Sequence, residues 1–286
     1  PDERNLIVPR MDWTVNKNML TKGDWMTLDI INQNFMERPI YFAVSVGSEA
    51  YLGFDKYFQL EGLTYRIVPK LNTSGSPFTS PVRWDACYQN MMTKFKFGGI
   101  AENKDIYLDE NNLRMVVNLK SNFGRLAQTM LDKGQPEKAA AAIDYSLKEM
   151  PADKVPHSYF DVEYPEVYYR AGQKDKAHKL LEEMWAAAKD DLNYYRKVYE
   201  YTLNEANKAG DAAYAKSLRE GSFGERREVR ENTTVMIQLV LAAAKYENPD
   251  YYQANVAPNQ NRWLKLVVNS KEEMDELDQI IKGTTD

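Results

Sequence analysis

With 286 residues, of which 43% are hydrophobic and 28% charged, the chain has the composition of a globular protein, and we expect two domains. Its net charge of −5 and its scattered basic residues argue against a nucleic-acid partner, and its apolar runs are too short to span a bilayer. One cysteine and two histidines exclude an internal disulfide and a zinc site of the His/Cys kind, so we expect no metal site and no cofactor.

The chain starts at Pro1 and not at a methionine. A signal peptide or an upstream domain would lie outside this sequence, so we expect a fragment of a longer protein or a mature form. The scarcity of cysteine suits a reducing compartment and an exported protein equally, and it does not decide where the protein resides.

The first 112 residues carry their apolar side chains in short bursts between turn residues, which is typical of strands. We predict strands at residues 6–8, 39–46 and 62–68, the last two rich in β-branched and aromatic side chains. A helix is predicted at residues 21–34, between the first two strands. This order predicts a small α/β domain over residues 1–112.

The helix at residues 21–34 is expected to begin with a cap in which Thr21 pairs with Asp24. Helical spacing predicts a core-facing stripe that consists of Trp25, Leu28, Asp29, Ile31 and Asn32. Further along, we predict a loop at residues 70–82, a second helix at residues 84–95 and a linker at residues 97–109.

Two strings in this half carry a family resemblance: Arg-Pro-Ile-Tyr-Phe-Ala at residues 38–43 and Glu-Gly-Leu-Thr-Tyr-Arg at residues 61–66. Residues 5–150 resemble the soluble C-terminal portion of a family of multi-spanning membrane proteins from Gram-negative gut bacteria, although Met36 stands where that family usually has tryptophan. The membrane half of that family is similar to glycosyltransferases of the protein O-mannosyltransferase type, which use lipid-linked sugars. The resemblance implies membrane helices before Pro1 and a periplasmic position for this chain, at the extracytoplasmic face of the inner membrane.

The second half repeats a six-residue phrase at residues 134–139, 172–177 and 210–215. Each copy begins with glycine and ends with alanine, and successive copies are 38 residues apart, which is typical of stacked supersecondary units. Apolar residues at helical spacing precede Gly134 and follow Pro136, which predicts two antiparallel helices. Glycine permits the left-handed backbone of a tight turn, and the small alanine lets the helices approach closely.

The first copy resembles the tetratricopeptide repeat in the order and spacing of Leu126, Ala127, Met130, Gly134, Ala139, Ile143, Ser146, Leu147 and Pro151. The resemblance implies an all-α superhelix over residues 113–286. Repeats are expected at about residues 120–157, 158–195 and 196–233, the third of them degenerate and followed by C-terminal helices. Because the family period is about 34 residues, the additional residues are expected in links near residues 153–157 and 190–193. The predicted fold class is therefore α+β, a small α/β domain followed by a tetratricopeptide-like α-α superhelix.

The sequence does not single out a catalytic group. Ser45 and Ser48 flank a glycine without the Gly-x-Ser-x-Gly spacing of a nucleophile turn, so a strand-end turn is the preferred interpretation. Four carboxylates are candidates for a glycoside-cleaving pair, but they are better explained as caps, surface groups or partners of buried arginines: Asp24, Asp29, Glu37 and Glu61. We expect Arg38 and Arg66, which lie beside strands that look buried, to pair with a carboxylate such as Asp29 or Glu61. We assign no catalytic residue to this fragment, and the resemblance implies glycosyltransferase activity for the parent protein only.

Protein–protein interaction is the expected function, because repeat arrays present surfaces to partners. The tetratricopeptide resemblance implies a concave groove lined by Gln128, Tyr159, Glu166, Tyr169, Lys197, Glu200, Asn204 and Asn207. This lining suits a protein or peptide partner, a glycoprotein included. An accessory domain that binds glycan or acceptor substrate for the membrane enzyme is the alternative, and a stand-alone enzyme is the third class. If the groove binds no partner, we expect it to be solvated, or filled by a helix at residues 225–246 or by the tail from Trp263.

Overall fold

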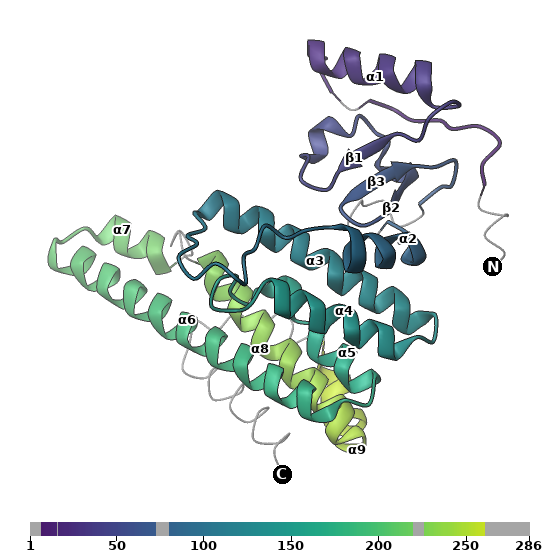
Figure 1. The fold of residues 1–286 in the computed structure, drawn as a ribbon. Helices are drawn as coiled ribbons and strands as arrows, with labels where there is room; N and C mark the ends of the chain where they lie inside the picture. The colour runs from purple at the N-terminus through teal and green to yellow at the C-terminus, as the bar shows by residue number, and fades with distance from the viewer. Residues whose placement is uncertain (1–6, 16, 73–79, 220–225, 261–286) are drawn as a thin grey trace. The chain divides into compact units, whose positions relative to one another are not determined.

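The computed structural model describes residues 7–15, 17–72, 80–219 and 226–260 (Figure 1). The chain divides into two compact units, Pro1–Pro156 and His157–Asp286. It is mostly helical, with a three-stranded antiparallel sheet in the first unit, so the coarse fold class is α+β. The domain boundary predicted between residues 112 and 113 falls within helix α3 (Glu110–Asp132), and a domain division at that point stays a prediction.

The sheet of the first unit consists of β1 (Tyr41–Ala43), β2 (Phe58–Leu60) and β3 (Thr64–Ile67) in the order β1-β3-β2. The strands predicted at residues 39–46 and 62–68 correspond to β1 and β3. Strand β2 was not predicted from the sequence. Gly62, at a φ of +101°, lies in the turn between β2 and β3, where a left-handed backbone is required.

The strand predicted at residues 6–8 is not observed in the described part of that segment. Ile7 forms an isolated bridge with Lys70, and Leu6 lies outside the described residues. A single bridge does not extend the sheet by a strand.

The core of the first unit is aromatic. The rings of Phe58 and Tyr65 stack with centroids 5.2 Å apart, and Tyr51 meets Phe58 edge-on at 5.0 Å. Such pairs contribute roughly 0.5–1.5 kcal/mol each beyond the area they bury. Short strands are therefore held together largely by ring packing.

A buried carboxylate connects three segments around this sheet. Glu61 accepts hydrogen bonds from the Tyr41 hydroxyl at 3.1 Å, from Arg83 at 3.2 Å and from Arg66 at 3.4 Å. The predicted pairing of Arg66 with a carboxylate is confirmed, whereas the same pairing predicted for Arg38 stays a prediction. Two guanidinium groups offset the cost of burying one carboxylate, so Glu61 has a structural role.

Helix α1 (Lys22–Asn34) begins as predicted. The Asp24 amide donates to the Thr21 hydroxyl at 3.2 Å, and the Thr21 amide donates to the Asp24 carboxylate at 2.8 Å. Lys17 also donates to Asp24, and this hydrogen bond lowers the pKa of the carboxyl. The predicted core-facing stripe is wrong in most positions: Ile31 is buried, but Trp25 is 62% exposed. Helical spacing identified one face of α1 without showing whether another element covers it.

The remaining helices of the first unit are α2, α3 and α4, of which α3 and α4 form a hairpin. α2 (Trp84–Gln89) packs on α3, and α3 forms an antiparallel pair with α4 (Pro136–Glu149). Arg125 of α3 donates to the Ser80 carbonyl at 2.8 Å and to the Tyr65 hydroxyl at 3.3 Å. This arginine joins the helical hairpin to the sheet within one unit.

The repeated glycines adopt the predicted backbone. Gly134, Gly172 and Gly210 have φ values of +70°, +72° and +72°. In each copy the amide after the glycine donates to a carbonyl of the preceding helix: Gln135 to Met130, Gln173 to Tyr168 and Asp211 to Ala206. The paired alanines, Ala139, Ala177 and Ala215, are buried, as predicted for the first two. The repeated phrase therefore encodes one recurrent helix–turn–helix unit.

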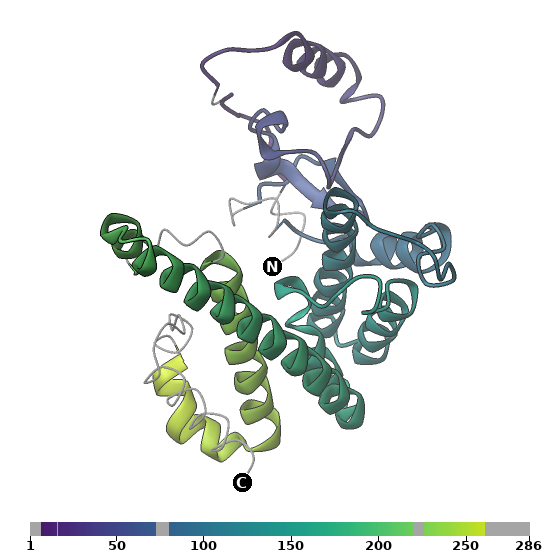
Figure 2. The same cartoon turned by 90° about the vertical axis from the view of Figure 1, so that its left-hand side faces the viewer.

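The second unit is organised around one long helix, α6 (Lys174–Lys208), which follows α5 (Tyr164–Arg170). Figure 2 shows α6 as an uninterrupted helix beside α8 (Arg226–Glu247). The link predicted near residues 190–193 is therefore wrong, because residues 186–199 contain neither glycine nor proline to end the helix. The second helix of one repeat and the first helix of the next are continuous. Separate stacked hairpins, and hence a tetratricopeptide superhelix, stay a prediction.

The second unit ends with short helices. α7 (Ala212–Ser217) pairs with the last turns of α6, where Ala206, Ala215 and Leu218 form a small apolar cluster. α9 (Pro249–Tyr251) follows α8 and leads into short π and 3₁₀ turns that end at residue 259. The main packing of the second unit is therefore between the two long helices, α6 and α8.

Candidate functional site

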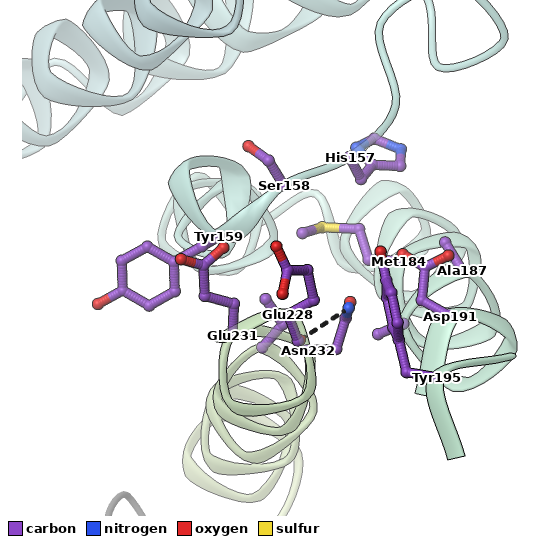
Figure 3. A pocket seen from close by; sticks show the side chains of 12 residues that line it. His157, Ser158, Tyr159, Met184, Ala187, Asp191, Tyr195, Glu228, Glu231 and Asn232 are labelled. Carbon is purple, nitrogen blue, oxygen red and sulfur yellow. Dashed lines mark hydrogen bonds between the residues drawn. The ribbon is translucent and has the colours of Figure 1, made fainter. Parts of the chain in front are cut away.

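A pocket of about 200 Å³ lies within the second unit, between the 3₁₀ helix Tyr159–Asp161, α6 and α8 (Figure 3). Its lining residues are His157, Ser158, Tyr159, Met184, Ala187, Ala188, Asp191, Tyr195, Glu228, Glu231, Asn232 and Val235. We call it the acidic pocket, because its charged side chains are carboxylates and its described lining contains no lysine or arginine.

One wall of the acidic pocket is fixed by a capped turn. The Ser158 hydroxyl accepts from the Phe160 amide at 3.3 Å, and the Asp161 carboxylate accepts from the Ser158 amide at 3.4 Å. This reciprocal cap holds the short helix in place. Tyr159, which is 47% exposed, thereby stands at the rim.

The other walls come from helix faces. On α6, Met184, Ala188 and Asp191 follow one another at helical spacing, with Tyr195 one turn further. On α8, the Asn232 side chain donates to the Glu228 carbonyl at 3.1 Å, as the dashed line in Figure 3 marks. Because α6 and α8 pack against each other, carboxylates of both helices share one small space.

The environment of Asp191 is unfavourable for negative charge. Burial raises the pKa of Asp191, and the charge of Asp190 adds to the rise, whereas a hydrogen bond with Asn232 opposes it. The Glu228 Oε2 atom is buried and has no hydrogen-bond partner. Figure 3 shows the Glu228 carboxylate pointing toward Ser158, into the space between the labelled side chains.

His157 adds a buried polar group to the wall. Its side chain is 6% exposed, and its Nδ1 atom lies 3.5 Å from the Asp161 carboxylate without making a hydrogen bond. Within the described ranges, no group of three His, Cys, Asp or Glu side chains is arranged to hold a metal ion.

The structure places the predicted groove residues in different surroundings. Tyr159 lies at the pocket rim. Glu166 accepts from the Tyr246 hydroxyl at 2.7 Å and from Lys245 at 3.1 Å, and Tyr169 stacks on the Tyr246 ring. At these two positions α8 contacts residues of the predicted groove lining. This contact corresponds to the alternative in which the helix at residues 225–246 fills the groove. The tail from Trp263 lies outside the described residues.

The other predicted groove residues are not gathered at the pocket. Lys197, Glu200, Asn204 and Asn207 are exposed on the second half of α6, where Asn207 accepts from Arg219 at 3.5 Å. Gln128 is partly buried on α3, in the first unit. A groove that combines all eight residues stays a prediction.

An exposed aromatic row borders the acidic pocket. Tyr194 and Tyr201, seven residues apart on α6, are 62% and 67% exposed, and Lys197 and Asn204 lie on the same face. The Tyr194 ring contacts the Tyr195 ring at 5.2 Å, and Tyr195 lines the pocket. We call Tyr194, Lys197, Tyr201 and Asn204 the tyrosine face.

The carboxylates of the pocket were not predicted from the sequence as a site. Glu228, Glu231 and Asn232 form a visible polar stripe at helical spacing on α8, but Asp191 fell in a predicted link. Their meeting depends on the packing of two helices that are distant in the sequence. Periodicity alone does not supply that information.

Comparison with known proteins bears on the first unit. Residues 1–85 match a family model described as TMEM260-associated domain 2. Both resemblance strings, at residues 38–43 and 61–66, lie within the match, so this part of the chain is similar to a domain associated with that membrane-protein family. Comparisons with curated proteins and with solved structures found no match. Among the described helices, none is both long and apolar enough to cross a membrane.

Proposed function

We propose that this chain is a non-catalytic protein–protein interaction region, the extracytoplasmic C-terminal part of a glycosyltransferase-like membrane protein. The family match at residues 1–85 supports the association with a membrane protein. The three glycine turns and the buried alanines support the proposal that the helical repeats are tetratricopeptide-like, even though α6 joins two of them. The partner is a protein or peptide, which a membrane glycosyltransferase would need as its acceptor or as an assembly factor.

The observation that carries this proposal is the tyrosine face. Tyrosine is enriched where proteins bind one another, because it buries a large ring and keeps a hydrogen bond. Tyr194 and Tyr201 supply ring surface, and Lys197 and Asn204 supply donors and an acceptor between them. A segment that lies along α6 would contact both rings.

A direct test is selection of short displayed peptides on the purified chain. We expect enriched peptides that bind, and Tyr201→Ser should weaken their binding by about ten-fold or more, since aromatic anchors commonly dominate interfaces. Tyr107→Ser is the matched control, because Tyr107 is also highly exposed but lies in the first unit. If no peptide is enriched, or if the two variants behave alike, the proposal fails.

A second candidate function is glycan or acceptor-substrate binding for the parent enzyme. The observation that favours it is the acidic pocket, where the Tyr195 ring lies with Asp191 and Asn232, groups that accept and donate hydrogen bonds to sugar hydroxyls. A glycan array probed with the purified chain discriminates the two functions. Saturable glycan binding that Asn232→Ala abolishes, without peptide enrichment, would favour this second function.

The membrane topology is tested separately. The upstream reading frame should encode several hydrophobic segments, and a periplasm-dependent reporter fused to the parent protein directly after the residue that is Asp286 in this chain should be active. An inactive reporter, with a cytosol-dependent reporter active at the same position, would refute the extracytoplasmic placement.

A further inference from the structure

The second unit includes 26 residues, 261–286, that follow the last described residue, Gln260. We call residues 261–286 the C-terminal segment. Its sequence places apolar side chains at the spacing of one face of a helix: Val267, Met274, Leu277 and Ile281. An apolar stripe of this kind needs a surface that covers it.

The tyrosine face offers such a surface within the same unit. Tyr194 and Tyr201 are 62% and 67% exposed and stand seven residues apart on α6. Met274 and Ile281 are also seven residues apart. Two helices that run side by side bring residues of the same seven-residue spacing into repeated contact. The two rings of the face therefore match the two apolar side chains of the segment.

Charge complements this match. Lys197 lies between the two rings and is the charged residue of the tyrosine face. Residues 271–278 of the C-terminal segment carry five carboxylates and one lysine. Two of these carboxylates, Glu273 and Asp278, flank the apolar stripe beside Leu277 at helical spacing. Exposed ion pairs add little affinity, but complementary charge determines which surfaces fit each other.

The C-terminal segment is long enough to reach the face. Glu247, at the end of α8, lies 3.0 Å from His178 and 3.7 Å from Lys174, near the start of α6. From His178, Tyr201 is about 34 Å further along α6, at 1.5 Å per residue. The short turns between Glu247 and Gln260 pack against α8, and 26 further residues span about 39 Å even as a helix. The segment can therefore lie along both rings.

We infer that the C-terminal segment lies along the tyrosine face and competes with the protein partner for it. The inference rests on the proposed function, because it gives the regulation of the same surface: a partner has to displace the segment. A tethered segment acts at an effective concentration on the order of 1 mM, so a weak contact is enough to cover the face. The apparent affinity for the partner falls in proportion to the fraction of molecules in which the face is free.

The first experiment maps the contact in the whole chain. The photo-crosslinker p-benzoylphenylalanine is placed at Leu277, the dilute protein is irradiated, and mass spectrometry identifies the cross-linked residues. We expect intramolecular cross-links to residues 194–204 of α6. The same group at Gln279 should cross-link there about five-fold less or weaker still, because residues two apart in a helix do not face the same side. Equal cross-linking from the two positions, or cross-links that avoid α6, would overturn the inference.

A variant of the face identifies the tyrosine ring as the contact. In the protein with the photo-crosslinker at Leu277, Tyr201→Ser should lower the cross-linked fraction by about five-fold, since aromatic anchors dominate such contacts. Tyr214→Ser, at a 47% exposed tyrosine on α7, is the matched control and should leave that fraction unchanged. Circular dichroism and thermal unfolding establish that each variant folds. If Tyr201→Ser folds and cross-links as before, the inference is wrong.

Peptide binding then separates this inference from the proposed function. Leu277→Asp interrupts the apolar stripe and should strengthen the binding of selected peptides by about ten-fold, the change expected when the free fraction rises from about one-tenth to nearly one. Gln279→Asp is the matched control and should bind as wild type does. Stronger binding by Leu277→Asp alone supports both proposals. Equal binding by wild type and Leu277→Asp overturns the inference and leaves protein binding intact. If neither protein enriches a peptide although the cross-links form, the segment covers the face and the proposed function is refuted.

Discussion

Tyr169 of α5 and Tyr246 of α8 stack with ring centroids 5.2 Å apart and an interplanar angle of 6°. The Tyr246 hydroxyl also donates to Glu166, one turn before Tyr169. One side chain thus contacts two positions of α5, through its ring and through its hydroxyl. This arrangement fastens α5 to the end of α8 and explains why two predicted groove residues are engaged within the unit.

Tyr246→Ala should lower the free energy of unfolding by about 1.5–3 kcal/mol, because the variant loses the stacked ring and the hydrogen bond to Glu166. Tyr246→Phe keeps the ring and should cost about 1 kcal/mol. Urea unfolding followed by circular dichroism measures both. Tyr201→Ala, at an exposed position, is the control, and an equal loss in Tyr246→Ala and Tyr201→Ala would contradict the structural role of the pair.

Ala177 is fully buried where α5 and α6 approach each other. Ala177→Leu should overpack this crossing and destabilise the protein by roughly 1–3 kcal/mol. Ala213→Leu, at an exposed position on α7, should change stability little. An unchanged melting temperature in Ala177→Leu would refute the close helix crossing that the repeated phrase predicts.

Gly134 and Gly172 both have left-handed backbones, and a Cβ atom at either position would meet nothing within 4 Å. Replacement by alanine therefore tests backbone conformation without steric clash, and each should cost about 1–2 kcal/mol. Asparagine should cost less, since it tolerates this conformation better. Gly23→Ala, within α1, should instead stabilise by roughly 0.5–1 kcal/mol. Neutral Gly134→Ala and Gly172→Ala variants would contradict the turn assignment.

Features that depend only on a few adjacent residues could be predicted from the sequence. The Thr21–Asp24 cap, the glycine turns and the buried alanines each depend on a few adjacent residues, and all are observed. The continuous α6 was missed because the family period suggested a break that no glycine or proline enforces. The exposed Trp25 and the shared pocket of Asp191 and Glu228 depend on which elements pack together, which periodicity does not specify.

Burial raises the pKa of Tyr169 from 10.0 to about 12, and the Glu247 carboxylate adds to the rise. Between these two values the unfolded chain releases the phenolic proton while the folded chain keeps it. The unfolded state then binds fewer protons, so the free energy of unfolding falls as pH rises from 10 to 12. Tyr169→Phe removes this ionisation, so its free energy of unfolding should fall less steeply over that pH range. The free energy of unfolding of Tyr194→Phe should follow that of wild type. Urea unfolding at a series of pH values measures all three. Parallel plots of the free energy of unfolding against pH for wild type and Tyr169→Phe would contradict the raised pKa of Tyr169.

Arg125 joins the helical hairpin of the first unit to its sheet, and the prediction for this residue tests whether residues 1–112 and α3 fold as one body. Its guanidinium donates to the Ser80 carbonyl at 2.8 Å, the Ser80 hydroxyl at 3.0 Å and the Tyr65 hydroxyl at 3.3 Å, and burial lowers its pKa. Arg125→Met keeps the apolar stem but leaves the Ser80 carbonyl without this donor, so we expect a loss of roughly 2–4 kcal/mol.

Limited proteolysis tests whether the contacts of Arg125 only add stability or are needed to keep the sheet and the α3–α4 hairpin associated. In wild type, cleavage near Gly98 and Gly99 should leave the fragments associated, because α2 packs on α3 and Arg125 contacts Ser80 and Tyr65. In Arg125→Met the fragments should separate on gel filtration. Arg114→Met, at an exposed position earlier on α3, is the matched control and should behave as wild type does. If wild-type cleavage releases a helical fragment that is monomeric and as stable as the whole chain, the sheet and the hairpin are independent, and the small domain predicted at residues 1–112 gains support over the larger unit observed here.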